Sequence, residues 1–357
     1  MTRPLQCQTA AANSQESSFL AIIPAVIKST VDSARLPIHN GTLAPVSAMQ
    51  ARLSLVTQMD TPANVAVKLT AFNLELYNPD STSTNASTYA IPQPPTILSL
   101  AVPEQSLKGR SKLIIPEQDV TINNTAEFSK FLVNAFSANA NVTIGVRAAA
   151  TAKVAASSYP FTLDKNVSFA GLRSLAGLQV LSTAAVGNDT PATMLHGNMS
   201  LPNYSPLMIG LGDRVTYNVF SVDRNAGANS STNSSEPFQI GHAIVPNLLL
   251  QPGNQTIDFE GRTDTQSVMD NLATLLHGMD KETGELGFSV VGDRAYVGNE
   301  HIPYLDDLMK NVKVQGTMSF CEAVKLVDVS GVPMDMMDLV DLDKVFDCMF
   351  PDDMPTE

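Results

Sequence analysis

Leu113-Ile114-Ile115-Pro116 is an apolar strand pattern that ends in a turn, and Leu248-Leu249-Leu250-Gln251-Pro252-Gly253 has the same character further along the chain. A short alternating strand follows in both places, at Val120-Thr121-Ile122 and at Thr256-Ile257-Asp258-Phe259. Because the same order of elements occurs twice, we interpret these stretches as the beginnings of two copies of one structural unit.

Each copy continues with a helix signal. Asn124 in the first copy and Thr263 in the second are each followed three residues later by Glu or Gln, which is the spacing of a capping box. Apolar residues then recur at helical spacing, which predicts helices at Thr125–Phe136 and Asp264–Met279, each with one buried face. We expect each helix to pack on a sheet.

Strict alternation returns after each helix, with apolar residues at 142, 144 and 146 and again at 286, 288 and 290. This period of two predicts strands with one buried face. The predicted fold class is therefore mainly β (α+β), with two tandem immunoglobulin- or fibronectin-like β-sandwich domains and one packed helix in each. The domains are placed at 19–174 and 175–320, after a polar lead-in at 1–18 and before an acidic, methionine-rich tail at 321–357.

The composition narrows the class of protein. The chain of 357 residues is 44% hydrophobic and 16% charged, which is typical of a folded chain with room for two domains. The net charge of −13 argues against nucleic acid as a partner, because nucleic-acid binding requires a basic surface. The acidity is local, with 21 acidic and 7 basic residues from Gln255 to Glu357.

Asparagine sequons are unusually frequent in this sequence. Eleven N-x-[S/T] sites occur, roughly three times as many as chance placement gives, and this excess indicates a protein that passes through the secretory pathway. A cytosolic β protein rich in Asn, Ser and Thr is the alternative. Pro191 and Pro206 make Asn188 and Asn203 poor acceptors. The candidate glycosylation sites are Asn40, Asn85, Asn123, Asn141, Asn166, Asn198, Asn229, Asn233 and Asn254.

The start of the chain does not look like a targeting segment. Met1 to Gln15 lacks a positive region followed by an apolar core, so it is not a signal peptide. The apolar stretch Phe19–Ile27 is too short to span a bilayer. Either the sequons are not glycosylated, or a targeting or anchor helix is missing from this chain.

The three cysteines, Cys7, Cys321 and Cys348, form no metal-binding spacing. Cys321 and Cys348 are a candidate disulfide, and free buried cysteine is the alternative. In the tail that surrounds Cys348, acidic and apolar residues alternate. That pattern fits either a short helix or a disordered interaction segment, and both interpretations stay open.

No catalytic constellation is present in the sequence. The five histidines have no metal-ligand spacing, and there is neither a G-x-S-x-G elbow nor a phosphate-binding glycine loop. The acidic residues of the tail lack the glycine and terminal glutamate of an EF-hand loop, so a solvated acidic face is the better interpretation. We therefore expect a protein that is not an enzyme and that needs no cofactor or metal.

Three phrases carry a resemblance to a known family: Asn198-Met-Ser-Leu-Pro-Asn203-Tyr-Ser-Pro206, Leu211-Gly212-Asp213-Arg-Val-Thr-Tyr217, and Ile240-Gly-His-Ala-Ile-Val-Pro246-Asn-Leu-Leu-Leu250-Gln-Pro-Gly-Asn254. The chain resembles a fungal family of unknown function. The resemblance implies tandem β-sandwich domains similar to the type-2 late-embryogenesis-abundant fold. It also implies an N-terminal membrane anchor and a location on the vacuolar or cell-surface side of a membrane. It implies no catalytic residues.

Two functions follow as the main hypotheses. The first is a non-catalytic module that binds lipid or a membrane surface, and the second is a glycosylated structural or adhesion protein of the cell surface. An enzyme with an unrecognised site is the third. For the first hypothesis, the residues expected to face lipid are Ile240, Ala243, Val245, Leu248, Leu250, Leu272, Leu275 and Leu276, with an ordinary closed core as the alternative.

Overall fold

The computed structural model describes residues 29, 35–61, 66–81, 93–189, 192–222, 237–277, 279–280 and 283–324. The chain divides into two compact units that interleave along the sequence. Unit 1 comprises Met1–Gly41, Ser54–Asn123 and Thr143–Ser168, and unit 2 comprises Thr42–Leu53, Asn124–Val142 and Phe169–Glu357. The predicted domains, in contrast, divide the chain at a single point. The predicted lead-in and nearly all of the predicted tail lie outside the described residues.

Unit 1 is built on a sheet with the strand order β5-β4-β8-β3-β6, in which β9 also pairs with β8. The strand β2 pairs with β7. The strands are β2 (Gln50–Asp60), β3 (Ala66–Leu69), β4 (Phe72–Tyr77), β5 (Thr96–Val102), β6 (Gln105–Lys108), β7 (Arg110–Thr121), β8 (Asn141–Val154) and β9 (Ser157–Ala170).

The sheet of unit 1 holds a polar network around Arg147 of β8. The Arg147 Nε lies 2.6 Å from Glu75 Oε2, and the guanidinium lies over the Tyr77 ring at 5.4 Å. The hydrogen bond from Arg147 holds the pKa of the Glu75 carboxyl below its usual range. The Tyr77 ring covers Gly145, where a Cβ atom would lie 2.2 Å from the ring. Gly145 is therefore required by the close approach of the aromatic ring.

Tyr77 makes the stability of unit 1 sensitive to alkaline pH. Burial, together with the 2.6 Å hydrogen bond that it donates to Asp164 Oδ1, raises its pKa to about 12. Because the folded state keeps this proton longer than the unfolded state, its stabilisation is present below about pH 10 and is lost as pH rises towards about 12. We expect Tyr77→Phe to make the fall in stability between pH 9 and pH 11 shallower, as measured by urea unfolding at a series of pH values. An unchanged pH dependence would contradict this assignment.

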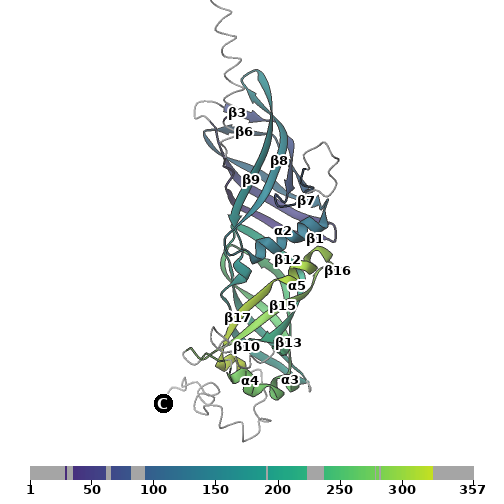
Figure 1. Ribbon diagram of the computed structural model, residues 1–357, viewed down its shortest axis with the longest axis vertical. Coiled ribbons are helices and arrows are strands. Elements are labelled where there is room, and N and C mark those ends of the chain that lie inside the picture. The colour runs from purple at the N-terminus through teal and green to yellow at the C-terminus, as the bar shows by residue number, and fades with distance from the viewer. Residues whose placement is uncertain are drawn as a thin grey trace, which may run out of the picture. The chain divides into compact units, whose positions relative to one another are not determined.

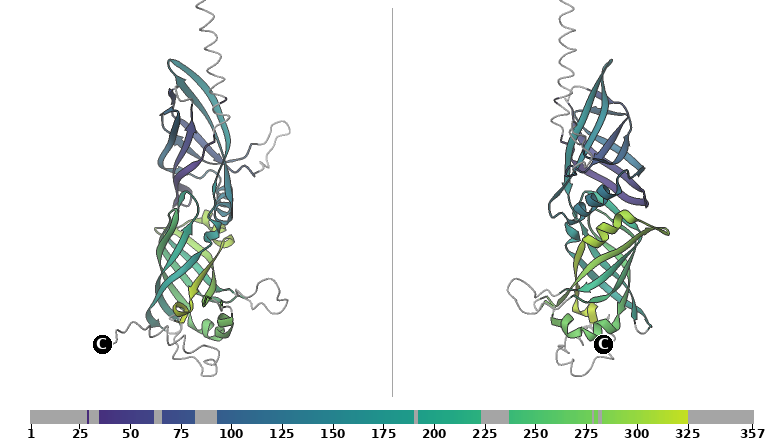
Figure 2. Two further views of the ribbon diagram at one scale, coloured as in Figure 1. Left: turned by 90° about the vertical axis from the view of Figure 1, so that its left-hand side faces the viewer. Right: turned by 45° about the vertical axis from the view of Figure 1, so that its right-hand side comes forward.

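Unit 2 contains a closed barrel. Its seven strands follow the order β15-β17-β10-β11-β14-β13-β12, and an additional pairing of β12 with β15 closes the ring. All these pairings are antiparallel except that of β10 with β17. The strands are β10 (Leu178–Asp189), β11 (Ala192–Asn203), β12 (Leu207–Ser221), β13 (Gln239–Leu250), β14 (Gly253–Asp264), β15 (Glu285–Val297) and β17 (Lys313–Ser319) (Figures 1 and 2).

Shorter elements surround this barrel. The strand β1 (Ile38–Ser47) pairs with β12, and the two-residue β16 (Glu300–His301) pairs with β15. Figure 2 shows α3 and α4 at one end of the barrel. The helices are α2 (Thr125–Ser137), α3 (Thr265–Asp270), α4 (Leu272–His277), α5 (Asp306–Asn311) and α6 (Phe320–Val324), with the 3₁₀ turns η1 (Arg173–Leu175) and η2 (Pro303–Leu305).

Helix α2 forms as the sequence predicts. The Asn124 side chain accepts a hydrogen bond from the Glu127 N–H at 3.1 Å, and the predicted apolar face is buried. Its packing partner differs from the prediction, because α2 belongs to unit 2 and lies beside α5 (Figure 1). The Phe128 ring meets Tyr304 edge to face at 5.2 Å, and Ser129 Oγ donates to the Tyr304 carbonyl. The two predicted helices therefore do not serve one domain each.

The second predicted helix is wrong in its boundaries. Asp264, not Thr263, caps it by accepting a hydrogen bond from the Ser267 N–H at 3.1 Å. The helix then breaks at Asn271, whose backbone leaves the helical region, so that α3 and α4 replace one long helix. The chain is mainly β, as predicted, but its strands form a barrel and a separate sheet and do not clearly form two immunoglobulin-like sandwiches.

Candidate functional site

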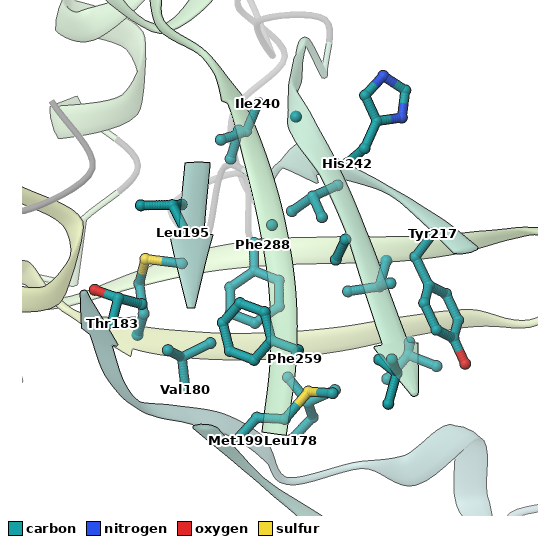
Figure 3. Close-up of a pocket in the computed structure, with 18 of the residues that line it drawn as sticks. Leu178, Val180, Thr183, Leu195, Met199, Tyr217, Ile240, His242, Phe259 and Phe288 are labelled. Atoms are coloured by element: carbon teal, nitrogen blue, oxygen red, sulfur yellow. The ribbon is translucent and has the colours of Figure 1, made fainter. Parts of the chain in front are cut away.

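The barrel of unit 2 encloses an apolar cavity of about 100 Å³. All seven barrel strands contribute to its wall, together with Leu175 of η1. In Figure 3 the Phe259 and Phe288 rings lie in the middle of the lining, whereas the His242 ring points out of it. The apolar part of the wall consists of Leu175, Leu178, Val180, Leu195, Met199, Leu201, Val219, Ile240, Ala243, Val245, Leu248, Phe259, Phe288, Val290, Val314 and Met318.

The cavity arises where small residues occupy interior positions of neighbouring strands. Tyr217 of β12 is paired with Ala243 of β13, and Ala243 is paired with Gly261 of β14. A Cβ atom at Gly261 would lie 3.6 Å from Leu195 and from the His242 carbonyl oxygen, which is an ordinary contact distance, so this position has room for a methyl group. Interior positions alternate with exterior ones along each strand, and at this level of the barrel two of three residues are too small to fill the interior.

Other interior glycines are already covered by their neighbours. A Cβ atom at Gly316 would lie 2.2 Å from Leu178 Cδ2 and 2.5 Å from the Phe288 ring. A Cβ atom at Gly197 would lie 2.7 Å from the Phe259 ring. These glycines therefore admit large side chains from the neighbouring strands, whereas Gly261 keeps room for a methyl group.

Three hydroxyl-bearing residues line this otherwise apolar wall. Thr183 is satisfied, because its hydroxyl and its N–H both donate to the Glu322 carboxylate of α6. The hydroxyls of Tyr217 and Thr263, in contrast, make no hydrogen bond to any residue that the structure describes. Burial raises the pKa of the Tyr217 phenol well above its usual range, so Tyr217 is a neutral hydrogen-bond donor throughout the physiological range.

One end of the wall is held by a backbone in an unusual conformation. Arg173, Ser174 and Leu175 have φ values of 54°, 50° and 52°, a left-handed conformation that costs roughly 1–2 kcal/mol for each residue that is not glycine. Tyr204 stabilises this turn. Its hydroxyl donates a hydrogen bond to the Ala176 carbonyl at 2.8 Å, and the Arg173 guanidinium lies over its ring, 4.8 Å from the ring centroid. The turn places Leu175 against the cavity.

Four of the eight residues expected to face lipid line the cavity: Ile240, Ala243, Val245 and Leu248. Leu250 is fully buried and Leu272 is buried, but neither is part of the cavity wall. Leu275 lies in α4 and is half-buried, also away from the wall. The side chain of Leu276 lies outside the described part of the structure.

Sequence reasoning missed the wall residues on β10, β11, β15 and β17. Examples are Val180, Leu195, Phe288 and Val314. Phe288 and Val314 lie between polar or small neighbours, which marks them as inward-facing, whereas Leu181 and Met194 obscure this alternation beside Val180 and Leu195. That signal does not reveal which strands close on one another, so it does not assign them to one cavity.

The candidate glycosylation sites are distributed over both units. Asn40, Asn123, Asn141, Asn166 and Asn254 are exposed, and Asn198 is half-buried and accepts a hydrogen bond from Ser182. Asn85, Asn229 and Asn233 lie outside the described residues. Cys321 takes part in a disulfide, but Cys7 and Cys348 both lie outside the described residues, so the pairing of Cys321 with Cys348 stays a prediction.

Two searches over the described part of the chain give negative findings. No group of three or more His, Cys, Asp or Glu side chains is arranged to hold a metal ion there. None of the helices there is long and apolar enough to cross a membrane.

Comparison with known proteins gives a match to a family model over part of the chain. Residues 95–219 match the family model DUF3712, described as a protein of unknown function. No protein of curated function matches the chain.

Among solved structures, red sea bream transglutaminase is similar at 16% identity and a TM-score of 0.22, over 80% of this chain and 31% of that one. The YadV chaperone (7% identity, TM-score 0.18) and a Mobiluncus mulieris adhesin (8%, 0.18) are each matched over 80% of this chain and 98% of their own. The chain thus spans about a third of the length of the transglutaminase. Such low scores carry no argument about function.

Proposed function

We propose that the barrel of unit 2 binds an apolar ligand, as a non-catalytic lipid- or membrane-associated module. The observation that supports this proposal most strongly is the apolar cavity inside the closed barrel, which is lined by sixteen apolar side chains from η1 and all seven strands. Ligand sites in proteins are typically apolar concavities with a few polar groups, and the interiors of β-barrels are a common place for them.

The volume of the cavity limits what it holds. An engineered cavity of about 150 Å³ is known to bind benzene, and the cavity here, at about 100 Å³, is smaller. The buried part of the ligand is therefore a short apolar group or the end of a longer acyl chain. Each buried methylene contributes about 0.8 kcal/mol, so a segment of five methylenes would gain a gross binding free energy of about 4 kcal/mol, before ordering costs.

Native mass spectrometry of the whole chain, purified from a eukaryotic host, tests the proposal. We expect a non-covalent adduct that organic extraction removes and identifies as an apolar small molecule. If no adduct is found, and if the protein also fails to bind added fatty alcohols of increasing length, the proposal is wrong.

Filling the cavity should remove binding and raise stability. Ala243→Leu adds three carbon atoms at the level of Gly261, where space is available. Since cavities cost about 24 cal/mol per Å³, filling part of 100 Å³ should stabilise unit 2 by about 1 kcal/mol. Chemical denaturation, monitored by hydrogen exchange, measures this gain in the stability of unit 2. Native mass spectrometry should show the loss of the adduct.

The matched control is Ala185→Leu, the same substitution at an exposed position of β10 in the same barrel. It should leave both ligand binding and stability nearly unchanged. Equal effects of the two substitutions would show that the cavity is not the binding site.

A location in the secretory pathway, on the vacuolar or cell-surface side of a membrane, forms the second part of the proposal. The sequons and the likeness to a fungal family with domains similar to the type-2 late-embryogenesis-abundant fold support it. The alternative function, a glycosylated structural or adhesion protein, is favoured by one observation. Five sequon asparagines have exposed side chains that a glycan can reach: Asn40, Asn123, Asn141, Asn166 and Asn254.

Glycopeptide mapping should separate exposed from buried sequons. Asn203 is 3% exposed, and its amide donates to the carbonyls of Leu207 and Leu250 at 2.8 and 3.0 Å. A glycan would replace one of the two hydrogens on this buried nitrogen and so break at least one of these bonds, and we expect Asn203 to be unmodified. In protein from its native host, Asn141 and Asn254 should carry glycans. A fully glycosylated Asn203 or the absence of any glycan would contradict this prediction.

A further inference from the structure

The cavity contains two hydrogen-bonding groups that the protein does not use. The hydroxyls of Tyr217 and Thr263 make no hydrogen bond to a described residue, although both residues line the cavity. Among side-chain oxygens and nitrogens of the described residues that are sealed from solvent-sized molecules, only the Tyr159 hydroxyl lacks a partner. The Tyr217 and Thr263 hydroxyls therefore still contact open space.

That open space is the cavity. Val215 and Val219 lie two residues on either side of Tyr217 and share its face of β12. Val215 is fully buried and Val219 lines the cavity, so this face is the interior one. Thr263 is 3% exposed and is paired with Gly241, one interior level from the pair of Ala243 and Gly261.

Water is a poor partner for these hydroxyls. A buried water molecule is usually held by two to four polar groups, and the rest of this wall is almost entirely apolar. An unpaired hydroxyl in such surroundings is unfavourable, whereas a ligand with its own polar atom can pair with it.

The ligand's polar atom must also be uncharged. His242 and Arg262 are paired across β13 and β14, and both side chains are exposed, on the outer face of the barrel. The wall thus offers no positively charged partner for a carboxylate, and the buried Glu322 carboxylate behind Thr183 would repel one. Burying an unpaired charge is much more costly than burying a hydroxyl. An alcohol or carbonyl oxygen meets both conditions, but a carboxylate does not.

We propose that the cavity selects a small neutral amphiphile, an apolar group that carries one hydroxyl or carbonyl, and that Tyr217 and Thr263 are the residues that select it. This inference rests on the proposed function of the barrel. It adds that the ligand is recognised by its oxygen atom as well as by its apolar surface.

The test compares three probes of equal carbon number, 1-pentanol, n-pentane and pentanoate, by methyl NMR titration of the whole chain at neutral pH. Wild-type protein should bind 1-pentanol most tightly and pentanoate least. Tyr217→Phe and Thr263→Val should each weaken 1-pentanol binding by about 3- to 10-fold and leave n-pentane binding within about twofold, which is the range expected for one hydrogen bond. Tyr159→Phe removes a phenol hydroxyl from β9 of unit 1, away from the cavity, and should change neither affinity.

The outcomes separate this inference from the proposed function. If no probe binds wild-type protein, the barrel is not an apolar binding site and both proposals fail. If 1-pentanol and n-pentane bind equally and the two substitutions change neither affinity, the barrel binds apolar groups without recognising an oxygen atom. Only the present inference is then overturned. Tightest binding of pentanoate would also overturn it.

Discussion

Replacing Phe128 by alanine is expected to lower the free energy of unfolding of unit 2 by about 3–5 kcal/mol, which is typical of a buried phenylalanine. Phe128 is 2% exposed, and its ring contacts Tyr304 at 5.2 Å and Phe131 at 6.4 Å. The loss falls on unit 2 because α2 packs on α5 and η2 of that unit. Hydrogen exchange read separately over the two units measures the effect.

Lys130→Ala is the control for this prediction. Lys130 lies on the exposed side of α2, and its ammonium pairs with Glu127 at 2.7 Å. Lys130 is exposed whereas Glu127 is buried, and a half-exposed pair of this kind contributes about 1 kcal/mol or less. If Phe128→Ala were no more destabilising than Lys130→Ala, or if it affected the exchange of unit 1 alone, the assignment of α2 to unit 2 would be wrong.

The second large effect is a contrast between two interior glycines of the barrel. Gly316→Ala should destabilise unit 2 by about 1–3 kcal/mol, because its methyl group would collide with Leu178 and Phe288. Gly261→Ala should be neutral or slightly stabilising, because its methyl group would make ordinary contacts with Leu195 and the His242 carbonyl oxygen. Thermal and urea unfolding of the two variants, measured side by side, give the comparison.

The two substitutions add the same methyl group to the same barrel, so general effects of replacing glycine by alanine cancel between them. Only the local space differs. Equal destabilisation by both would mean that the space near Gly261 is already filled. Equal tolerance would mean that Leu178 and Phe288 move aside easily and that the interior is not closely packed.

Local features of the fold were predictable from sequence, because their signals lie within a few residues. The cap at Asn124 and the apolar face of α2 are examples, as is the alternation of Val142, Ile144 and Val146 in β8. The error at the second helix is also local. Thr263 and Asp264 are both good caps, and the carboxylate of Asp264 takes the role while Thr263 completes a strand that faces the cavity.

Closure of the barrel was not predictable in the same way. It depends on the pairing of β12 with β15 and on the parallel pairing of β10 with β17, in which Leu178 meets Gly316. No turn joins these strands, so no short-range pattern reports their contact. The same holds for the hydrogen bond from Ser129 to Tyr304, which places α2 in unit 2.

These limits explain why only half of the residues expected to face lipid line the cavity. Ile240, Ala243, Val245 and Leu248 share one strand, β13, whose alternation is visible in the sequence. Leu272 was grouped with them because a single long helix was expected beside that strand, and the break at Asn271 removes this arrangement.

Both proposals require an open apolar cavity within the barrel. A crystal structure of the whole chain under xenon pressure tests for this cavity directly. Xenon enters empty apolar cavities and is visible as strong density. We predict a xenon atom beside Ala243, Gly261 and Leu195 in the wild-type protein, and none there in Ala243→Leu. An interior filled by wild-type side chains, with no xenon at this position, would contradict the account.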